Sequence, residues 1–360
     1  MRDLDWVGTT KLRLSWGQAG NDRIGTAQFL SNMSTLNYPV GESQALNSGY
    51  VVGNIANNML GWETTTSYNV GVDFGLFNNR IYLSADYYKK TTKDLLLKAP
   101  VSLITGFANM MDNVGNVDNW GLEFELNTAN ITTNTFRWNS SLNISLNRNK
   151  ITSLGDDNSD IRSGQGNTII QRVGNPINSY MLLRVDRTLR AADFEADGVT
   201  PKPGIAIYTG QKPGDTKWVD VNDDGKITSA DYDVVGSYQP KFEWGFTNTF
   251  KYKNWEFSCF VTMQAGNKIR MNPSFDPAFA DLNVFSKEYY NRWLNPGDER
   301  KTNIPVIPSQ DLIRNIGKEN IEKAYNTYNY SQNRVADGSF CAYEKYLVGI
   351  SFTSKIPFTS

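Results

Sequence analysis

Hydrophobic and polar residues alternate one by one along residues 64–90. A period of two is typical of a β-strand, because successive side chains of a strand point to opposite faces. Asn78 and Asn79 interrupt the alternation, and both tolerate the positive φ of a tight turn. The pattern then resumes, which predicts one long antiparallel hairpin. Its apolar positions are Tyr68, Val70, Val72, Phe74, Ile81, Leu83, Ala85 and Tyr87.

The same design recurs in residues 120–147 and 242–263, with short turns between the paired strands. Further strands are expected at residues 12–16 and 346–352. The pattern gives about nine strands, with as many as two more at residues 177–189 or 204–210. The apolar positions of the two later hairpins are Trp120, Leu122, Phe124, Leu126, Phe136, Trp138, Leu142, Ile144, Leu146, Phe242, Trp244, Phe246, Phe250, Trp255, Phe257, Cys259, Val261 and Met263.

The strands are long and their connections are unequal. They run for about 10–13 residues, whereas globular strands average about 5–6 and membrane-spanning strands need about 9–11. The apolar faces carry no charged residue, and aromatic residues gather near the short turns, as in the aromatic girdle of an outer-membrane barrel. Long connections at residues 17–61, 149–240 and 264–338 alternate with these turns. The pattern predicts an all-β protein, an antiparallel transmembrane β-barrel with long extracellular loops; a soluble all-β protein is the alternative.

Composition removes several classes of function. The 360 residues carry 37 acidic and 36 basic side chains, so no electrostatic footprint for nucleic acid is present. The chain has no histidine, which excludes the common histidine-dependent catalytic and zinc sites. Its two cysteines, Cys259 and Cys341, lack metal-site spacing. We expect no enzyme, no catalytic residue and no bound organic cofactor.

The predicted strands do not close on themselves, because the pattern leaves an edge strand at each end of the sheet. Open strand edges are not tolerated in a bilayer, so the chain is expected to form only part of a barrel. The first 17 residues lack the apolar segment of a secretory signal peptide. The chain is therefore expected to be either cytosolic or incomplete.

Six segments in sequence order resemble one known family. The chain resembles the C-terminal barrel portion of the SusC/RagA-type TonB-linked outer-membrane proteins, the TonB-dependent receptors of Bacteroidetes, over nearly its whole length. The last segment departs from that family, which usually has an Arg-Leu pair in place of Ala342 and Tyr343. The six segments are "KLRLSWGQAGND", "WETTTSYNVGVDFGLFNNRIYLSADYYKKTTKDLLL", "NVGNVDNWGLEFELNT", "GNPINSYM", "KWVDVNDDGKITSADYDVVGSYQPKFEWGFTNTFKYKNWEFS" and "VADGSFCAYEKYLVGISF".

The resemblance implies TonB-dependent import of nutrients across the bacterial outer membrane. It implies a barrel of about 22 strands that holds an N-terminal plug, works with a SusD-like lipoprotein and the TonB complex, and carries oligosaccharides or peptides. Residues 1–360 are expected to form part of one barrel domain, about 9–11 strands of it, with plug, signal peptide and final strands lying outside the chain. Two other functions stay open: a surface calcium-dependent carbohydrate-binding or adhesion β protein, and an ungated porin.

The segment "DVNDDGKITSAD", residues 220–231, has the spacing of a calcium loop. Oxygen-bearing side chains occupy its positions 1, 3, 5 and 12, a glycine occupies position 6, and the backbone carbonyl of position 7 is a further ligand. Neither flanking segment has a helical period, so a structural site is expected and an EF-hand or dockerin pair is not. An Asp- and Gly-rich surface turn is the alternative. The predicted metal ligands are Asp220, Asn222, Asp224, Lys226 and Asp231.

Three further groups are candidates with ordinary structural alternatives. The spacing of Leu282, Phe285, Tyr289 and Trp293 predicts a loop helix, which either packs its own apolar stripe or contacts the substrate or the capping lipoprotein. Loop residues that can contact a ligand, or can be ordinary surface residues, are Tyr50, Trp62, Phe107, Met110 and Met111. Carboxylates expected to set the polarity of the barrel wall or meet the plug, instead of catalysing a reaction, are Asp73, Asp86, Glu123, Glu125 and Glu243.

Overall fold

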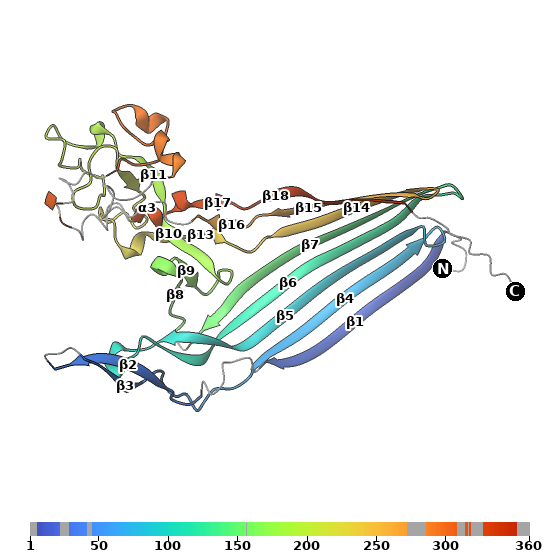
Figure 1. The fold of residues 1–360 in the computed structure, drawn as a ribbon, viewed down its shortest axis with the longest axis horizontal. Helices are drawn as coiled ribbons and strands as arrows, with labels where there is room; N and C mark the ends of the chain where they lie inside the picture. Colours follow the sequence, from blue (N-terminus) through green and yellow to red (C-terminus); the bar gives the residue numbers. More distant parts are fainter. Residues whose placement is uncertain are drawn as a thin grey trace.

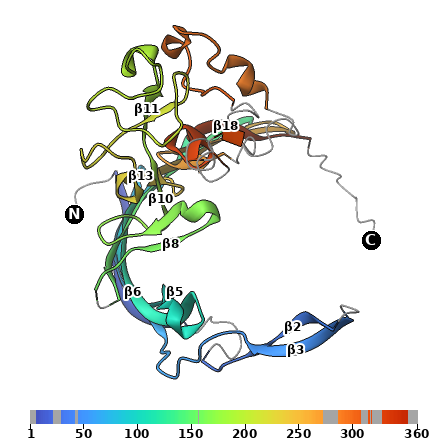
Figure 2. The same cartoon turned by 90° about the vertical axis from the view of Figure 1, so that its left-hand side faces the viewer.

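The computed structural model describes residues 6–21, 29–41, 45–155, 157–271, 286–307, 314–315, 317 and 327–350. Within these residues, eight long strands form one antiparallel sheet, hereafter the wall, which bends into an open arc (Figures 1 and 2). Neighbouring strands of the wall are consecutive in the chain apart from the loops between them. In spatial order the strands are β1 (Val7–Asn21), β4 (Glu63–Leu76), β5 (Ile81–Pro100), β6 (Asn109–Thr132), β7 (Phe136–Leu154), β14 (Phe242–Tyr252), β15 (Trp255–Ala265) and β18 (Phe340–Ile350).

The three predicted hairpins are confirmed, together with the positive φ expected at the Asn78–Asn79 turn. Asn78 and Asn79 have φ angles of 58° and 62°, and Lys253 has a φ of 50°. Asparagine reaches this left-handed region at lower cost than most residues, which is why two of them end β4 so tightly. The β14–β15 ladder runs without a register shift from Tyr252 opposite Trp255 to Phe242 opposite Ala265. Local turn chemistry and a period of two therefore determine these elements.

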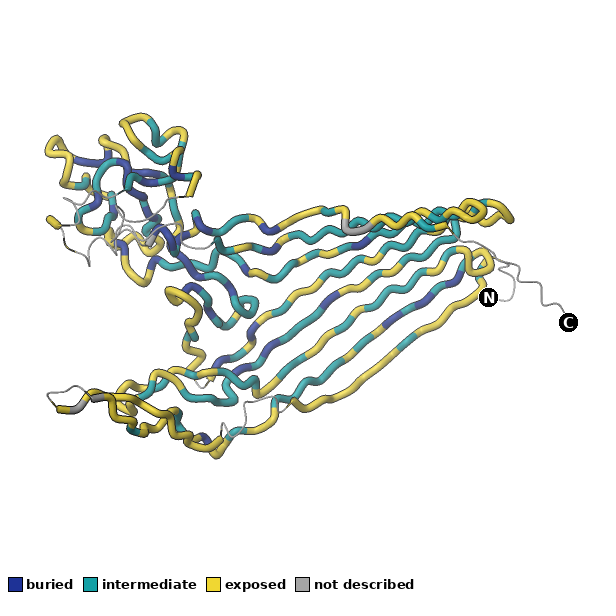
Figure 3. Tube along the Cα trace, viewed as in Figure 1, coloured by how far each residue is buried: buried dark blue, intermediate teal, exposed yellow. Residues whose placement is uncertain are grey.

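The wall reverses the usual relation between polarity and exposure. On the edge strand β1, Leu12 and Leu14 are 64% and 69% exposed, whereas Asp73 on the neighbouring strand is 5% exposed. Figure 3 shows β1 exposed along most of its length, whereas buried and intermediate positions alternate in the last part of β4. A soluble sheet would place its large apolar side chains inside. This arrangement is typical of a sheet whose outer face meets lipid and whose inner face is polar.

The wall has fewer strands than the sequence pattern suggested. Residues 177–189 do contain strands, β10 (Ser179–Leu183) and β11 (Val185–Thr188), but these belong to small separate sheets. Residues 204–210 contain no strand. Strands of four or five residues are too short to span a bilayer, and they pair with other short loop strands. β10 pairs with β9 (Ile169–Gln171) and β13 (Tyr232–Ser237), β11 pairs with β12 (Thr216–Trp218), and β8 (Ile161–Ser163) continues the first of these sheets beyond β9.

The long connections gather at the end of the wall opposite the short turns (Figure 1). Residues 179–239, 286–307 and 327–337, hereafter the loop body, include a buried cluster of their own, which contains Leu183, Trp218 and Tyr289. At the edge of the loop body, its strand β17 (Val335–Asp337) pairs with β16 (Lys268–Arg270). The hairpin of β2 (Met33–Val40) and β3 (Ala45–Val52) extends away from the wall at the same end (Figures 1 and 2).

The helix expected at residues 282–293 is only partly within the described residues. Leu282 and Phe285 lie outside them. In the described part, Lys287–Asn291 forms a short 3-10 helix, with Tyr289 buried in the core of the loop body. No helix among the described residues is long and apolar enough to cross a membrane.

Candidate functional site

The polar face of the wall is organised by one arginine that joins three strands. Arg13 on β1 donates through Nε to Asp73 at 3.0 Å and through Nη1 to Asp86 at 2.8 Å, and its Nη2 bonds both carboxylates. Gly71 pairs with Arg13 on one side and with Asp86 on the other. A Cβ at Gly71 would be 2.8 Å from the guanidinium carbon of Arg13. A side chain at this position would therefore block the contact. We name this group the wall clamp.

Beyond the wall clamp, the same face carries carboxylates that are not neutralised. Glu123, Glu125 and Glu243 line a hollow of about 420 Å³ together with Asp86. Glu123 on β6 and Glu243 on β14 both pair with Ser145, which places one on each side of β7. Among the described residues, none of these three glutamates forms an ion pair. The hollow therefore presents negative charge to whatever faces the wall.

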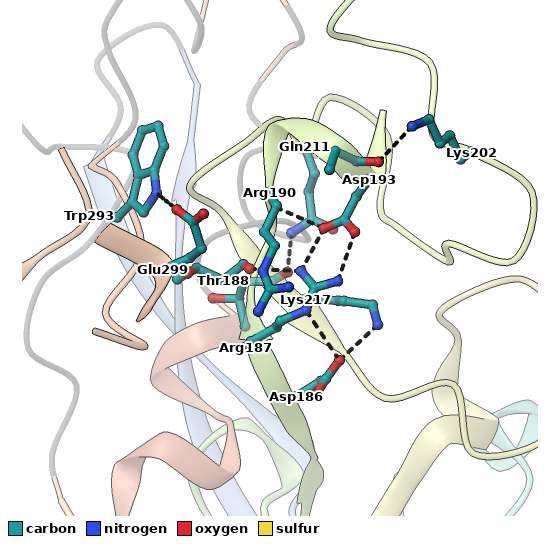
Figure 4. A network of polar contacts seen from close by, with 12 residues as sticks. Asp186, Arg187, Thr188, Arg190, Asp193, Lys202, Gln211, Lys217, Trp293 and Glu299 are labelled. Atoms are coloured by element: carbon teal, nitrogen blue, oxygen red, sulfur yellow. Dashed lines mark hydrogen bonds and ion pairs between the residues drawn. The ribbon is translucent and has the colours of Figure 1, made fainter. Parts of the chain in front are cut away.

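A second polar network ties the loop body together (Figure 4). Arg187 holds Asp193 through two hydrogen bonds of 2.6 and 2.7 Å, and the amide of Arg190 donates to the same carboxylate at 2.8 Å. Burial alone would raise the pKa of Asp193, but the hydrogen bonds from Arg187 and Arg190 outweigh it and lower that pKa. Nearby, Lys217 donates to Asp186 at 2.8 Å. Ionised side chains thus hold the β11–β12 ribbon to the following turn.

The predicted calcium loop closes around its own backbone amides. Gly225 has a φ of 79°, as the sixth position of such a loop requires, and its amide donates to Asp220 at 2.8 Å. Asp231 is buried and accepts from the amides of Val221 and Thr228 at 2.9 and 2.7 Å. Burial tends to raise the pKa of Asp231, but these amides lower it overall. The turn at Gly225 therefore agrees with the sixth position of the predicted loop.

The side chains of that loop fit a metal ion only in part. The amide of Lys226 donates to Asp224 Oδ1 at 2.8 Å and Asn222 Nδ2 donates to Asp224 Oδ2 at 3.0 Å, so both carboxylate oxygens of Asp224 already have partners within the loop. In the part of the chain that the structure describes, no three acidic, histidine or cysteine side chains converge as a metal site would require. Calcium binding by Asp220, Asn222, Asp224, Lys226 and Asp231 stays a prediction.

Three of the five candidate loop residues lie together. Phe107, Met110 and Met111 line a hollow of about 370 Å³ beside the outer ends of β5 and β6. Tyr50 and Trp62 are exposed and do not line it. The hollow also includes Lys98, which carries no periodic signal in the sequence because it follows three consecutive leucines, where the alternation has ended.

Arg13 and Arg187 were also missed. Arg13 carries a weak signal, because it is a charged residue on the polar side of an alternating strand. Its partners could not be named, since they depend on the register between three strands. Arg187 carries no periodic signal, because its short strand belongs to the loop body.

Comparison with known proteins agrees with this geometry. Residues 4–184 match the family described as "TonB dependent receptor-like, beta-barrel". The chain is 33% identical over 276 residues to TonB-dependent receptor P3 of Formosa agariphila, a match that covers 75% of this chain and 27% of that protein. It is 31% identical over 285 residues to TonB-dependent receptor SusC of Bacteroides thetaiotaomicron, covering 75% of this chain and 26% of SusC.

Solved structures share the fold. A chain of the RagAB peptide transporter superposes with a TM-score of 0.69 at 20% identity, over 96% of this chain and 35% of that one. The present chain thus spans about a quarter to a third of the relatives that it matches. With the family match extending over half of its residues and with the wall built as described, the chain belongs to the TonB-dependent receptor β-barrel family.

Proposed function

We propose that the chain forms part of the barrel wall of an importer in the bacterial outer membrane. The observation that carries this proposal is the reversed wall, with exposed apolar side chains on one face and the wall clamp on the other. Burying one large apolar side chain gains about 1.5–3 kcal/mol. Leu12, Leu14 and Trp16 on β1 are all exposed, so each of them would contribute a favourable free energy of this kind in a lipid environment.

The direction of the wall follows from its two unequal ends. Short turns and long loops occupy opposite ends of an outer-membrane barrel, with the short turns on the periplasmic side. The loop body and the β2–β3 hairpin would then lie outside the cell. In that position they are accessible to cargo and to a capping partner.

The proposed activity is TonB-dependent uptake of an oligosaccharide or peptide, together with a SusD-like lipoprotein. Its support is indirect: one relative is named SusC, and the RagAB structures are described as a peptide transporter. Energy would come from the TonB complex through parts of the longer protein. Catalysis is not part of the proposal.

We also propose that residues 220–231 bind calcium as a structural ion. Asp220, Asn222, Asp224, the Lys226 carbonyl and Asp231 would supply the oxygen ligands. Ile227, at position 8 of the loop, is buried in the core of the loop body. An ion here would stiffen the loop and, through Ile227, the packing of the loop body.

Membrane fractionation tests the main proposal. The full-length protein should appear in the outer-membrane fraction and should need detergent for extraction. Recovery of the full-length protein in a detergent-free soluble fraction would contradict the proposal, and would favour a surface-exposed calcium-dependent carbohydrate-binding or adhesion protein. Uptake assays in cells with and without the TonB complex then separate an importer from an ungated porin.

A further inference from the structure

A small hollow, hereafter the rim pocket, lies beside the ends of β5 and β6 that extend beyond the neighbouring strand β4. Its volume is about 370 Å³, near the lower end of the usual range for ligand sites. A pocket of this size holds one end of an oligomer better than the whole chain. Its lining residues are Gly53, Asn54, Ile55, Lys98, Phe107, Ala108, Asn109, Met110 and Met111.

Side-chain amides fix the two walls of the rim pocket to each other. Asn57 is nearly buried and donates through Nδ2 to the Met111 carbonyl and to Asp112 Oδ1, each at 3.0 Å. Asn113 exchanges two hydrogen bonds with the backbone of Gly61, at 2.7 and 3.1 Å. The segment that carries Ile55 is therefore attached to β6 along its length.

The segment that carries Ile55 is also fixed at its other end, at the foot of the β2–β3 hairpin. Asn54 donates to the Leu30 carbonyl at 2.9 Å and accepts from the Asn32 amide at 2.8 Å. The amide of Gly53 donates to the Asn32 carbonyl at 2.6 Å. A pocket whose connecting segment is fixed at both ends loses little conformational entropy when a ligand enters, which favours binding.

The chemistry of the lining is unusually simple. Ile55, Phe107, Met110 and Met111 are half-buried and supply the apolar part of the lining, whereas Lys98 is exposed and is the one charged residue that lines the pocket. Lys98 pairs with Met111 across the β5–β6 ladder, so these two side chains leave the sheet on the same face. Among the described residues, Lys98 forms no ion pair. A ligand that suits this lining has an anionic group next to an apolar surface.

We propose that the rim pocket binds the carboxylate-bearing end of the imported ligand. The Lys98 ammonium contacts the carboxylate, and Phe107 with the two methionines covers the apolar face beside it. A peptide with a hydrophobic C-terminal residue has this chemistry, and so does an acidic sugar, which presents the apolar face of its ring. The inference deepens the proposed import function and rests on it, since cargo approaching from outside would reach the rim first.

The two methionines of the rim pocket provide a direct test. The full-length protein is purified in detergent with ¹³C-labelled methionine methyl groups, and Met110 and Met111 are assigned with M110L and M111L. The probes are N-acetyl-leucine, N-acetyl-leucine amide, glucuronate and glucose. At least one carboxylate probe should shift both methyl signals saturably, and its neutral counterpart should bind up to about fivefold more weakly, the range of an exposed ion pair.

A matched pair of lysine variants isolates the charge. The preference for the carboxylate should disappear in Lys98→Gln and persist in Lys93→Gln, because Lys93 is exposed on the same strand but does not line the pocket. A response to N-acetyl-leucine alone identifies a peptide end, and a response to glucuronate alone identifies an acidic sugar; both outcomes support the site. The absence of saturable shifts with every probe, or a preference that survives in Lys98→Gln, overturns the inference. Binding is measured on isolated protein, so failure of the importer proposal would appear separately, in fractionation and uptake.

Discussion

At the scale of single residues, ionised side chains stabilise the wall and the loop body in different ways. In the wall clamp, Arg13 compensates two carboxylates that would otherwise repel each other across neighbouring strands. In the loop body, Arg187 and backbone amides stabilise the ionised form of the buried Asp193. Both groups depend on charge, but only the second lies where pH can be varied without disturbing a membrane-spanning strand.

The lowered pKa of Asp193 predicts that acid loosens the loop body. An unfolded aspartate titrates near pH 3.9, and the folded group titrates below that value. The stabilisation is therefore complete above about pH 5 and is lost as the pH falls through the lowered folded pKa. Hydrogen exchange of residues 186–193 should increase over this range in the parent protein.

The variant Asp193→Asn checks the cause of this pH dependence. It removes the ion pair with Arg187 and should destabilise the loop body by about 1–3 kcal/mol at neutral pH, while flattening the acid response. The control is Asp197→Asn, since Asp197 bonds only its own exposed turn. An acid response that is unchanged in Asp193→Asn would assign the effect to other groups.

Calcium should raise the stability of the loop body. A structural loop of this kind is expected to bind calcium with a dissociation constant of about 10⁻⁴–10⁻³ M, measurable by calorimetry on the intact protein. Asp220→Ala combined with Asp224→Ala should abolish binding. The control Asp223→Asn removes a charge from a position between the ligands and tolerates the φ of 55° found there. No binding by the parent at millimolar calcium refutes the prediction.

At the scale of elements, each long hairpin has one apolar face and one polar face. Val70 and Asn69 are neighbours on β4, and they point to opposite faces of the wall. Val70 is 46% exposed, so in a soluble protein a charge there would be almost without effect. The importer proposal gives the reverse expectation, because that face would meet hydrocarbon.

Lysine substitutions on these two neighbours therefore report on the surroundings of the wall. Val70→Lys should destabilise the full-length protein in lipid vesicles by about 2–4 kcal/mol, the value for a midplane lysine on a lipid face. Asn69→Lys, on the polar face, should have a much smaller effect. Urea unfolding in vesicles provides the measurement, and equal responses of the two variants would count against a lipid-facing surface.

Much of the wall could be predicted from the sequence, and most of the loop body could not. The period of two and the Asn78–Asn79 turn are local, so they specify strands and hairpins directly. The wall clamp depends on the register of β1, β4 and β5, which local pattern does not define. The loop body is held by pairs such as Leu183 with Ser331, which are distant in the chain and follow no period. The rim pocket could be predicted only in part: Phe107, Met110 and Met111 were candidates, but Lys98 was not.

At the scale of the whole molecule, the wall is a sheet with two unpaired edges. Among the described residues, β1 and β18 each pair on one side only. Exposed backbone groups on a long edge strand recruit further strands. In the longer relatives, additional chain is available to cover them.

The open edges predict how residues 1–360 behave when produced alone. The isolated chain should associate edge to edge in detergent, whereas the full-length protein should remain monodisperse. Size-exclusion chromatography with light scattering distinguishes the two. A monomeric, stably folded isolated chain would show that the edges are protected in a way that the wall does not reveal.

The pairing of Leu183 with Ser331 also has a kinetic consequence. Between these residues the chain runs along the wall and back through β14 and β15 before it returns to the loop body. The core of the loop body therefore cannot be completed until that hairpin is in place, and contacts so distant in sequence form late. During biogenesis, the loop body should therefore become resistant to proteases only after the β14–β15 hairpin has crossed the bilayer. The time at which this resistance appears would report on insertion of the wall.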